Sequence, residues 1–219
     1  MDISENIKKY REELPENVKL VAISKTKPNE DILKAYRAGQ RIFGENKIQE
    51  MTDKQEELPQ DIEWHMVGHV QRNKVKYMAS FVSLIHAVDS LKLLKEINKR
   101  AKQNERTINC LLQIKIAEED SKFGISKEEA REILESEAYS KMKNVRIIGL
   151  MGMATFTDDE EQVRQEFSFL KKVMDEFQKD FPELTELSMG MSGDYKIAVE
   201  CGSTMVRIGS SIFGARNYN

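Results

Sequence analysis

Short apolar runs alternate along almost the whole chain with longer segments that show helical spacing. Eight such runs are expected to form strands, at residues 19–25, 41–45, 63–68, 81–87, 108–116, 145–153, 186–191 and 205–209. Several are apolar almost continuously, as in Cys110-Leu111-Leu112-Gln113-Ile114, which is typical of strands that a parallel sheet buries on both faces. The alternation therefore predicts parallel strands joined by helical crossovers.

The segments between these runs carry the signals of amphipathic helices. One apolar stripe at helical spacing consists of Val163, Phe167, Leu170, Met174 and Phe177, and it predicts a long helix with one buried face. Other helices are expected to begin at Ser90 and at the capping box of Ser126 and Glu129, and others to end at Gly39 and Gly202. An additional helix is expected before the first strand, with an apolar face that includes Ile3, Ile7, Tyr10 and Leu14 and with Pro15 at its end.

Eight strand–helix units favour a (β/α)8 TIM-type barrel with an extra N-terminal helix. The alternative is a doubly wound open sheet, which usually carries a glycine-rich turn after its first strand; here Ser24-Lys25-Thr26-Lys27-Pro28 occupies that place. The chain has 219 residues, of which 40% are hydrophobic, enough for one well-buried core. We expect a single domain over residues 1–219, with the helix in 1–17, the barrel in 18–216 and a tail at 217–219.

Composition excludes several classes of function. The 34 Lys and Arg residues and 37 Asp and Glu residues are mixed along the chain, with a net charge of −3, so neither nucleic acid nor an anionic membrane is an expected partner. Cys110 and Cys201 lie in settings typical of buried apolar residues in a reducing compartment. No signal peptide and no apolar run of about 20 residues is visible. We therefore expect a soluble cytoplasmic protein.

In a parallel barrel the functional groups lie at the C-terminal ends of the strands. Reading only those ends gives Lys25, Asn46, His65, Lys122, Met153, Ser192, Arg207, Gly209 and Ser210. The set offers an amine for an aldehyde, a guanidinium for a ring nitrogen, and small residues whose N–H groups can hold a phosphate. These are the groups that a pyridoxal 5'-phosphate site needs.

Other interpretations of the same residues stay open at this point. Lys27 lies on the same side of an extended segment as Lys25, so position alone does not separate the two lysines. Arg207 could be an ordinary ion-pair residue, and Gly209-Ser210 an ordinary turn. A metal site at His65 and His69 is rejected, because their i, i+4 spacing crosses a strand end and Gly68. His86 is expected to be a strand-end or core histidine.

The chain also resembles the pyridoxal phosphate homeostasis protein family, whose members are single-domain relatives of the barrel half of alanine racemase. The resemblance runs from about Val18 to Arg216. It is carried by Ala22-Ile23-Ser24-Lys25-Thr26-Lys27-Pro28, Phe43-Gly44-Glu45-Asn46, Trp64-His65-Met66-Val67-Gly68, Gln71-Arg72-Asn73-Lys74, Ser121-Lys122-Phe123-Gly124-Ile125, Gly149-Leu150-Met151-Gly152-Met153, and the segment from Gly190 to Gly214. Small departures from the family pattern, at Lys47 and Val70, lie outside the proposed site.

The resemblance implies a role for each site residue. It selects Lys25 over Lys27 as the lysine that forms a Schiff base with pyridoxal phosphate, and it places Arg207 opposite the pyridine nitrogen. Ser192 and the backbone of Gly209 and Ser210 would hold the phosphate. Supporting neighbours would be Asn46, His65 and Met153. No catalytic residue and no metal are expected.

Two hypotheses about function follow. An arginine stays protonated and leaves the ring nitrogen unprotonated, which makes the ring a poorer electron sink. Racemases of this arrangement also use a tyrosine from a second domain, for which Tyr218 is a poor substitute. We therefore expect a monomeric, non-catalytic carrier or buffer of pyridoxal phosphate, with apo-enzymes as transient acceptors.

The alternative is a pyridoxal-phosphate-dependent amino-acid racemase or transferase, with Lys27 or Lys122 as base. A third possibility is a phosphate-binding barrel enzyme without a cofactor.

Overall fold

Eight parallel strands close into a barrel in the computed structural model, which describes residues 2–118 and 123–214. Each strand pairs with the next in sequence, and β8 pairs with β1 to close the ring, with Val21 opposite Arg207. The strands are β1 (Lys19–Ile23), β2 (Ile42–Glu45), β3 (Glu63–Met66), β4 (Leu84–Val88), β5 (Ile108–Gln113), β6 (Val145–Met151), β7 (Glu186–Met191) and β8 (Met205–Ile208). The predicted (β/α)8 barrel is therefore confirmed, and the open sheet was the wrong alternative.

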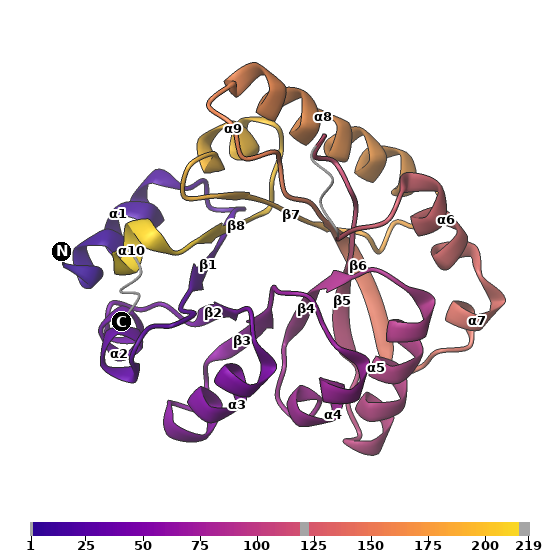
Figure 1. Cartoon of the computed structure of the whole chain (residues 1–219), viewed down its shortest axis with the longest axis horizontal. Helices are drawn as coiled ribbons and strands as arrows, with labels where there is room; N and C mark the ends of the chain where they lie inside the picture. Colours follow the sequence, from indigo (N-terminus) through magenta and orange to yellow (C-terminus); the bar gives the residue numbers. More distant parts are fainter. Residues whose placement is uncertain (1, 119–122, 215–219) are drawn as a thin grey trace.

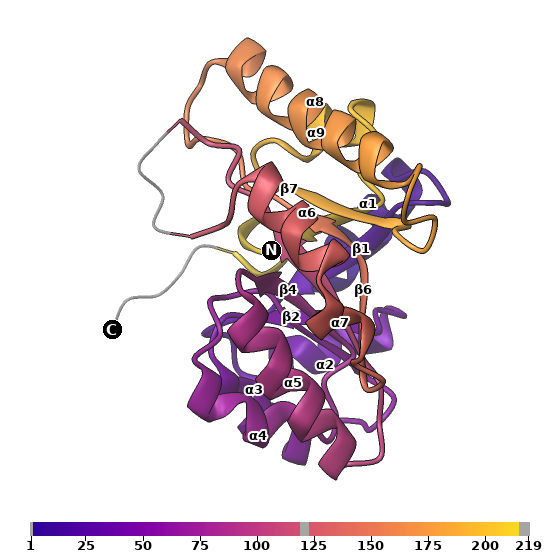
Figure 2. The ribbon, with the colours of Figure 1, turned by 90° about the vertical axis from the view of Figure 1, so that its right-hand side faces the viewer.

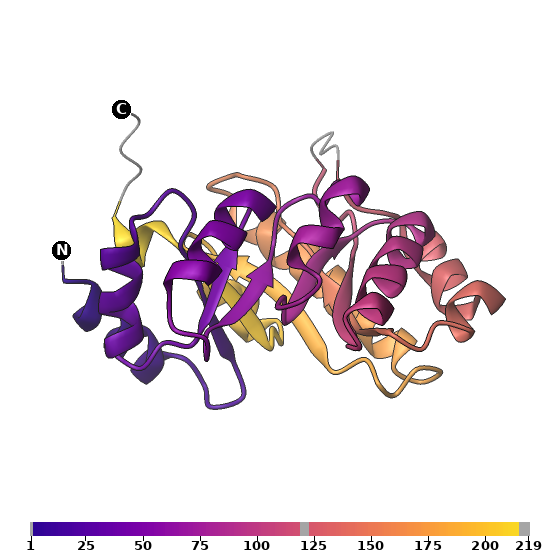
Figure 3. The ribbon, with the colours of Figure 1, turned by 90° about the horizontal axis from the view of Figure 1, so that it is seen from below.

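Helices surround the barrel on its outside, and α1 precedes the first strand as predicted (Figure 1). Figure 2 shows α8 and α9 on one side of the strands and α3, α4 and α5 on the other. In Figure 3 the helices of the first half of the chain lie in front of the strands. The helices are α1 (Ile3–Glu13), α2 (Asn29–Arg37), α3 (Ile48–Glu57), α4 (Val75–Met78), α5 (Leu91–Gln103), α6 (Lys127–Glu135), α7 (Glu137–Ser140), α8 (Glu160–Phe177), α9 (Tyr195–Glu200) and α10 (Ser210–Phe213), with a 3-10 turn at Arg72–Lys74.

The predicted helix signals act as expected. The Ser90 side chain accepts a hydrogen bond from the Leu93 N–H at the start of α5, and Ser126 and Glu129 form a capping box on α6. Gly39 and Gly202 follow the C-caps of α2 and α9 with φ of 97° and 96°, a conformation in which glycine avoids the Cβ penalty. The apolar stripe of α8 is buried along its whole length.

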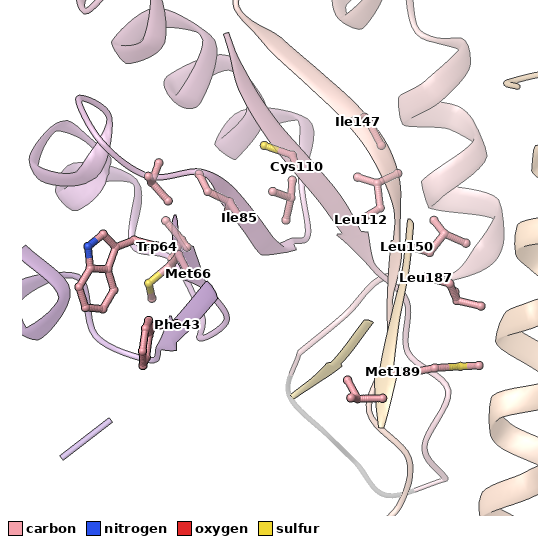
Figure 4. Close-up of a cluster of buried hydrophobic side chains, with 14 of the residues drawn as sticks. Phe43, Trp64, Met66, Ile85, Cys110, Leu112, Ile147, Leu150, Leu187 and Met189 are labelled. Atoms are coloured by element: carbon pink, nitrogen blue, oxygen red, sulfur yellow. The ribbon is translucent and has the colours of Figure 1, made fainter. Parts of the chain in front are cut away.

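Two apolar layers stabilise the barrel. The larger lies between the strands and the helices, and Figure 4 shows members of it, with Leu187 and Met189 pointing from β7 toward a neighbouring helix. The smaller fills part of the barrel interior and consists of Val21, Leu84, Ala87, Leu111, Met151 and Met205. Successive strand residues point to opposite faces, so both faces of each strand are buried, as the continuous apolar runs predicted.

Several strands are shorter than the sequence indicated. β5 ends at Gln113 and β6 at Met151, whereas 108–116 and 145–153 were predicted. β4 begins only at Leu84, because Phe81 lies in a turn, where its N–H donates to the Met78 carbonyl. Apolar residues thus continue beyond the ends of the hydrogen-bonded strands, into the loops that form the mouth of the barrel. Among the described residues, no helix is long and apolar enough to cross a bilayer.

Candidate functional site

A cavity of about 560 Å³ opens at the C-terminal ends of the strands. Seven of the eight residues predicted for the site line it, and they come from the ends of β1, β2, β6, β7 and β8: Lys25, Asn46, Met153, Ser192, Arg207, Gly209 and Ser210. Barrel closure brings these residues together from positions almost 190 apart in the chain. The exception is His65, which lies deeper in the barrel.

Lys25 lies in a tight turn directly after β1. The Lys27 N–H donates to the Ser24 carbonyl at 3.1 Å, which closes a four-residue turn over Ser24–Lys27. Thr26, the third residue of this turn, has a φ of 62°, which is a strained conformation for a β-branched side chain. Strained backbone of this kind is concentrated at functional sites, where the surrounding structure holds it in place.

Lys27 also lines the cavity, and its ammonium has defined partners. Lys27 Nζ donates to the carbonyls of Phe213 and Gly214, each at 3.1 Å. These carbonyls lie at the C-terminal end of α10, so Lys27 ties the turn after β1 to the segment after β8. Lys122, the other alternative base, lies outside the described residues.

Arg207 lies inside the barrel at the base of the cavity, with only 4% of its surface exposed. Its Nη2 donates to the Gly152 carbonyl at 3.1 Å, and its Nη1 donates to Ser188 Oγ at 2.7 Å. Burial lowers the pKa of Arg207 to about 10, and the nearby Asp194 opposes that change. The guanidinium is therefore charged at neutral pH, so this arginine acts as a hydrogen-bond donor.

A chain of buried polar side chains continues from Arg207 across the barrel. Ser188 Oγ lies 2.9 Å from His86 Nδ1, and His86 Nε2 lies 3.0 Å from His65 Nδ1. Burial lowers the pKa of His65 to about 3 and that of His86 well below its ordinary value, so both rings are neutral at physiological pH. Since Arg207 donates, the arrangement that uses each group once has Ser188 donating to His86 and His86 donating to His65.

His65 lies deeper than the cavity lining. The sequence analysis interpreted it as a strand-end residue and as a supporting neighbour of the cofactor. It is the third of the four residues of β3, is 4% exposed and does not line the cavity. Its link to the site runs through His86 and Ser188, neither of which was predicted as a site residue. Polar residues at inward-facing strand positions are the signal that could have identified this series of hydrogen-bonded side chains.

Ser192, Gly209 and Ser210 form the polar part of the cavity between the ends of β7 and β8. The Gly209 N–H donates to Ser192 Oγ at 3.3 Å, so the two loops are in direct contact. Asp194, which the sequence analysis missed, accepts a hydrogen bond from the Met191 N–H at 2.6 Å and fixes the Ser192 loop. Burial raises the pKa of Asp194, and Arg207 is the nearby cation that opposes the rise.

The rim of the cavity is apolar and was largely unpredicted. It includes the exposed side chains of Phe123, Met153, Phe156 and Met191, of which Phe156 is 96% exposed. His69 also lines the cavity, stacks on Phe123 with ring centroids 4.9 Å apart and lies 3.6 Å from Asp89. His65 and His69, whose spacing suggested a metal, therefore lie in different environments.

A second cavity, of about 410 Å³, lies at the opposite end of the barrel. It is lined by residues that precede β3, β4 and β5, including Ile62, Phe81 and Arg106. Arg106 there donates to the carbonyls of Ala79 and Val82, at 2.7 and 2.8 Å. These bonds hold the loop before β4.

The cavity at the C-terminal end contains donors that fit pyridoxal phosphate. Lys25 supplies an amine, Arg207 a buried guanidinium, and Ser192, Gly209 and Ser210 a hydroxyl and backbone N–H groups around one small pocket. Gly193, also in the lining, would place a Cβ in open space, so the pocket is not filled by its own chain at that point. An aldehyde, a pyridine nitrogen and a phosphate each have a complementary group among these residues.

Comparison with known proteins identifies a matching family model and several similar proteins. Residues 2–217 match the family model "Alanine racemase, N-terminal domain". A "Pyridoxal phosphate homeostasis protein" from Vibrio alginolyticus is 41% identical over 210 residues, covering 94% of this chain and 89% of that protein. One from Aquifex aeolicus is 40% identical over 202 residues, covering 91% and 88%.

Solved structures agree with these matches. PipY of Synechococcus elongatus, solved with PLP bound, superposes with a TM-score of 0.89 at 36% identity, covering 97% of this chain and all of PipY. An alanine racemase from Clostridium difficile shares the fold, with a TM-score of 0.75 at 16% identity over 60% of its own length. With its barrel, its strand-end residues and these relatives, the chain belongs to the pyridoxal phosphate homeostasis protein family.

Proposed function

We propose that this protein binds pyridoxal 5'-phosphate covalently through Lys25 and acts as a carrier or buffer in pyridoxal phosphate homeostasis, without robust catalysis. The observation that carries the proposal is the cavity that brings Lys25, Arg207 and the Ser192–Gly209–Ser210 pocket together. The names of its relatives and the PipY structure with PLP bound support the same function.

Each polar group has one role in this proposal. Lys25 Nζ forms a carbon–nitrogen double bond with the aldehyde carbon, and the aldehyde oxygen leaves as water. Arg207 donates a hydrogen bond to the pyridine nitrogen. Ser192 and Ser210 donate to the phosphate, and the Gly209 N–H joins them when it releases Ser192 Oγ. The bonds of Lys27 to the Phe213 and Gly214 carbonyls support Lys25 as the amine, because Lys27 would have to release both before it could react.

Arg207 is also the reason to expect little catalysis. The cofactor, when bound, supplies an electron sink whose strength depends on protonation of the ring nitrogen. A guanidinium with a pKa near 10 is too weak an acid to transfer its proton to a pyridine nitrogen at neutral pH, so it only donates a hydrogen bond. Arg207 therefore keeps the ring nitrogen unprotonated, which suits storage and delivery of the aldehyde better than carbanion chemistry. Apo-enzymes that need the cofactor are the proposed acceptors.

The test is the absorption spectrum of the purified protein with pyridoxal phosphate, before and after borohydride reduction, with peptide mapping of the product. The expected result is a visible band that bleaches and leaves a pyridoxyl group on Lys25. Lys25→Ala should lose the band and the reducible adduct with its fold intact, whereas the matched Lys27→Ala should keep both. An adduct that persists in Lys25→Ala would contradict the assignment.

A second measurement separates the carrier from an enzyme. The protein loaded with pyridoxal phosphate is incubated with L- and D-amino acids in deuterated water, and α-proton exchange is followed by NMR. We expect exchange no faster than with free pyridoxal phosphate. Exchange or racemisation well above that background, lost in Lys25→Ala, would instead favour the racemase or transferase alternative.

A further inference from the structure

Lys54, on the inward face of α3, lies beneath the turn that carries Lys25 and is almost fully buried, at 6% exposure. Its ammonium makes three short hydrogen bonds: to the Ser24 carbonyl at 2.8 Å, to Glu45 Oε1 at 2.8 Å and to Glu50 Oε1 at 2.7 Å. An ammonium has three N–H donors, so all the donors of Lys54 are used. A buried lysine with a complete set of acceptors is a fixed point in the structure.

Two of these acceptors also bind the turn itself. Glu50 Oε1 accepts from the Thr26 N–H at 2.5 Å, and Glu45 Oε1 accepts from Ser24 Oγ at 2.6 Å. The first and third residues of the turn are therefore held from below, one on each side of Lys25. With Lys54 between them, the two carboxylates connect the end of β2 and the helix α3 to the turn.

The network carries a cost that the barrel alone does not explain. Glu45 is fully buried, burial raises its pKa, and Lys54 is the main group that opposes the rise. Its second oxygen, Oε2, is buried without a hydrogen-bond partner among the described residues. Three apolar side chains would fill the same space without these desolvation costs. The presence of Lys54, Glu45 and Glu50 is thus better explained by the backbone that they hold in place than by a contribution to stability.

What it holds is the strained conformation of Thr26. A β-branched residue with a φ of 62° relaxes to negative φ unless another contact prevents it. The bond from the Thr26 N–H to Glu50 fixes the peptide between Lys25 and Thr26 in the orientation that this φ requires. That peptide adjoins the Cα of Lys25, whose side chain lines the cavity, so the bond to Glu50 fixes the backbone next to the reacting lysine.

We propose that Lys54, Glu45 and Glu50 are positioning residues that hold the turn Ser24–Lys27 so that Lys25 reaches the cofactor aldehyde. The inference rests on the proposed function of Lys25. It assigns to α3 a role in cofactor binding, although Lys54 itself does not line the cavity. Glu50 is the residue to substitute, because its side chain is 24% exposed, whereas removing Lys54 would leave the buried Glu45 charge without its cation.

The experiment compares Glu50→Ala with a matched control, Glu176→Ala, which removes the acceptor of another lysine, Lys127, far along the chain. Two ligands are titrated: pyridoxal phosphate, and pyridoxine 5'-phosphate, which has an alcohol in place of the aldehyde. Glu50→Ala should weaken pyridoxal phosphate binding about tenfold or more, because a small misplacement of a reacting group is costly. Its affinity for pyridoxine phosphate should change less than about twofold, and Glu176→Ala should change neither.

Hydrogen exchange of the Thr26 amide provides a readout that needs no ligand, and it should be faster in Glu50→Ala than in the control. Thr26→Gly tests the strain directly, because glycine adopts positive φ without a penalty. In the Thr26→Gly background, Glu50→Ala should weaken pyridoxal phosphate binding less than about threefold. A full tenfold loss in that background would show that strain at Thr26 is not what the network controls.

The outcomes separate this inference from the proposed function. If Lys25→Ala keeps its adduct, the function of Lys25 fails and the positioning role falls with it. If Lys25→Ala loses the adduct but Glu50→Ala binds both ligands as the unchanged protein does, only the positioning role is wrong. Equal losses for pyridoxal phosphate and pyridoxine phosphate would also overturn it, because they would show damage to the whole cavity.

Discussion

Replacing Ser188 with alanine tests whether the buried polar chain holds Arg207 in place. Ser188 is fully buried on β7, and its hydroxyl bonds both Arg207 Nη1 and His86 Nδ1. The substitution removes both partners at once and leaves a charged donor and a neutral ring nitrogen buried. Alanine fills nearly the same space, so the main effect is electrostatic.

The magnitude follows from those two bonds. A hydrogen bond to a charged group contributes about 1.5–3 kcal/mol and one between neutral groups about 1 kcal/mol. We therefore expect Ser188→Ala to lower the free energy of unfolding by about 2–4 kcal/mol, which corresponds to a fall in Tm of about 4–16 °C for a domain of this size. Arg207 should also become more mobile, and the visible band of the cofactor complex should shift.

Urea unfolding followed by circular dichroism measures the change, with Ser168→Ala as the matched control. Ser168 lies in α8, is half-buried and contacts Cys201 Sγ at 3.6 Å, so its loss should cost less than about 0.5 kcal/mol. If Ser188→Ala also falls within about 0.5 kcal/mol of the unchanged protein, the chain from Arg207 to His65 does not hold the guanidinium, and the reasoning is refuted.

Two further predictions concern the barrel interior and its outer layer. The folded-state pKa values of His65 and His86 lie below the unfolded value of about 6.5, so the unfolded chain binds protons first as the pH falls. Below pH 6.5, the free energy of unfolding should therefore decrease by up to about 1.4 kcal/mol per pH unit for each ring. NMR signals of both rings should stay constant from pH 8 to about 5; a midpoint near 6.5 would contradict this. Phe167→Ala should cost about 3–5 kcal/mol in urea unfolding, since Phe167 is fully buried, and a loss below 1 kcal/mol would show that α8 packs loosely.

Local patterns predicted the fold well because they report on each segment's own environment. The apolar runs gave all eight strands, and the Ser126–Glu129 capping box lies where α6 begins. Strand ends were less predictable, as at β6, where Met153 lies beyond the strand and at the cavity rim. A hydrophobic side chain is favoured both in a strand and at the mouth above it, so hydrophobicity does not show where the hydrogen-bonded ladder stops.

Part of the cavity lining could also be expected from the sequence. A rule of topology places functional residues at the C-terminal ends of parallel strands, and three residues chosen by it, Lys25, Ser192 and Arg207, line the cavity. His65, chosen by the same rule, lies outside that lining, because the rule does not show which buried strand-end side chains reach the cavity.

The sequence by itself determined the eight strands, the helices marked by capping signals and apolar stripes, and the closed barrel that they form. Only the tertiary structure decided which side chains meet. Ser188 and His86 are 102 residues apart in the chain, and Lys54 reaches back 30 residues to the Ser24 carbonyl. Periodicity specifies the face on which a residue lies, whereas its partner depends on strand order, register and closure of the ring, which arise from contacts along the whole chain.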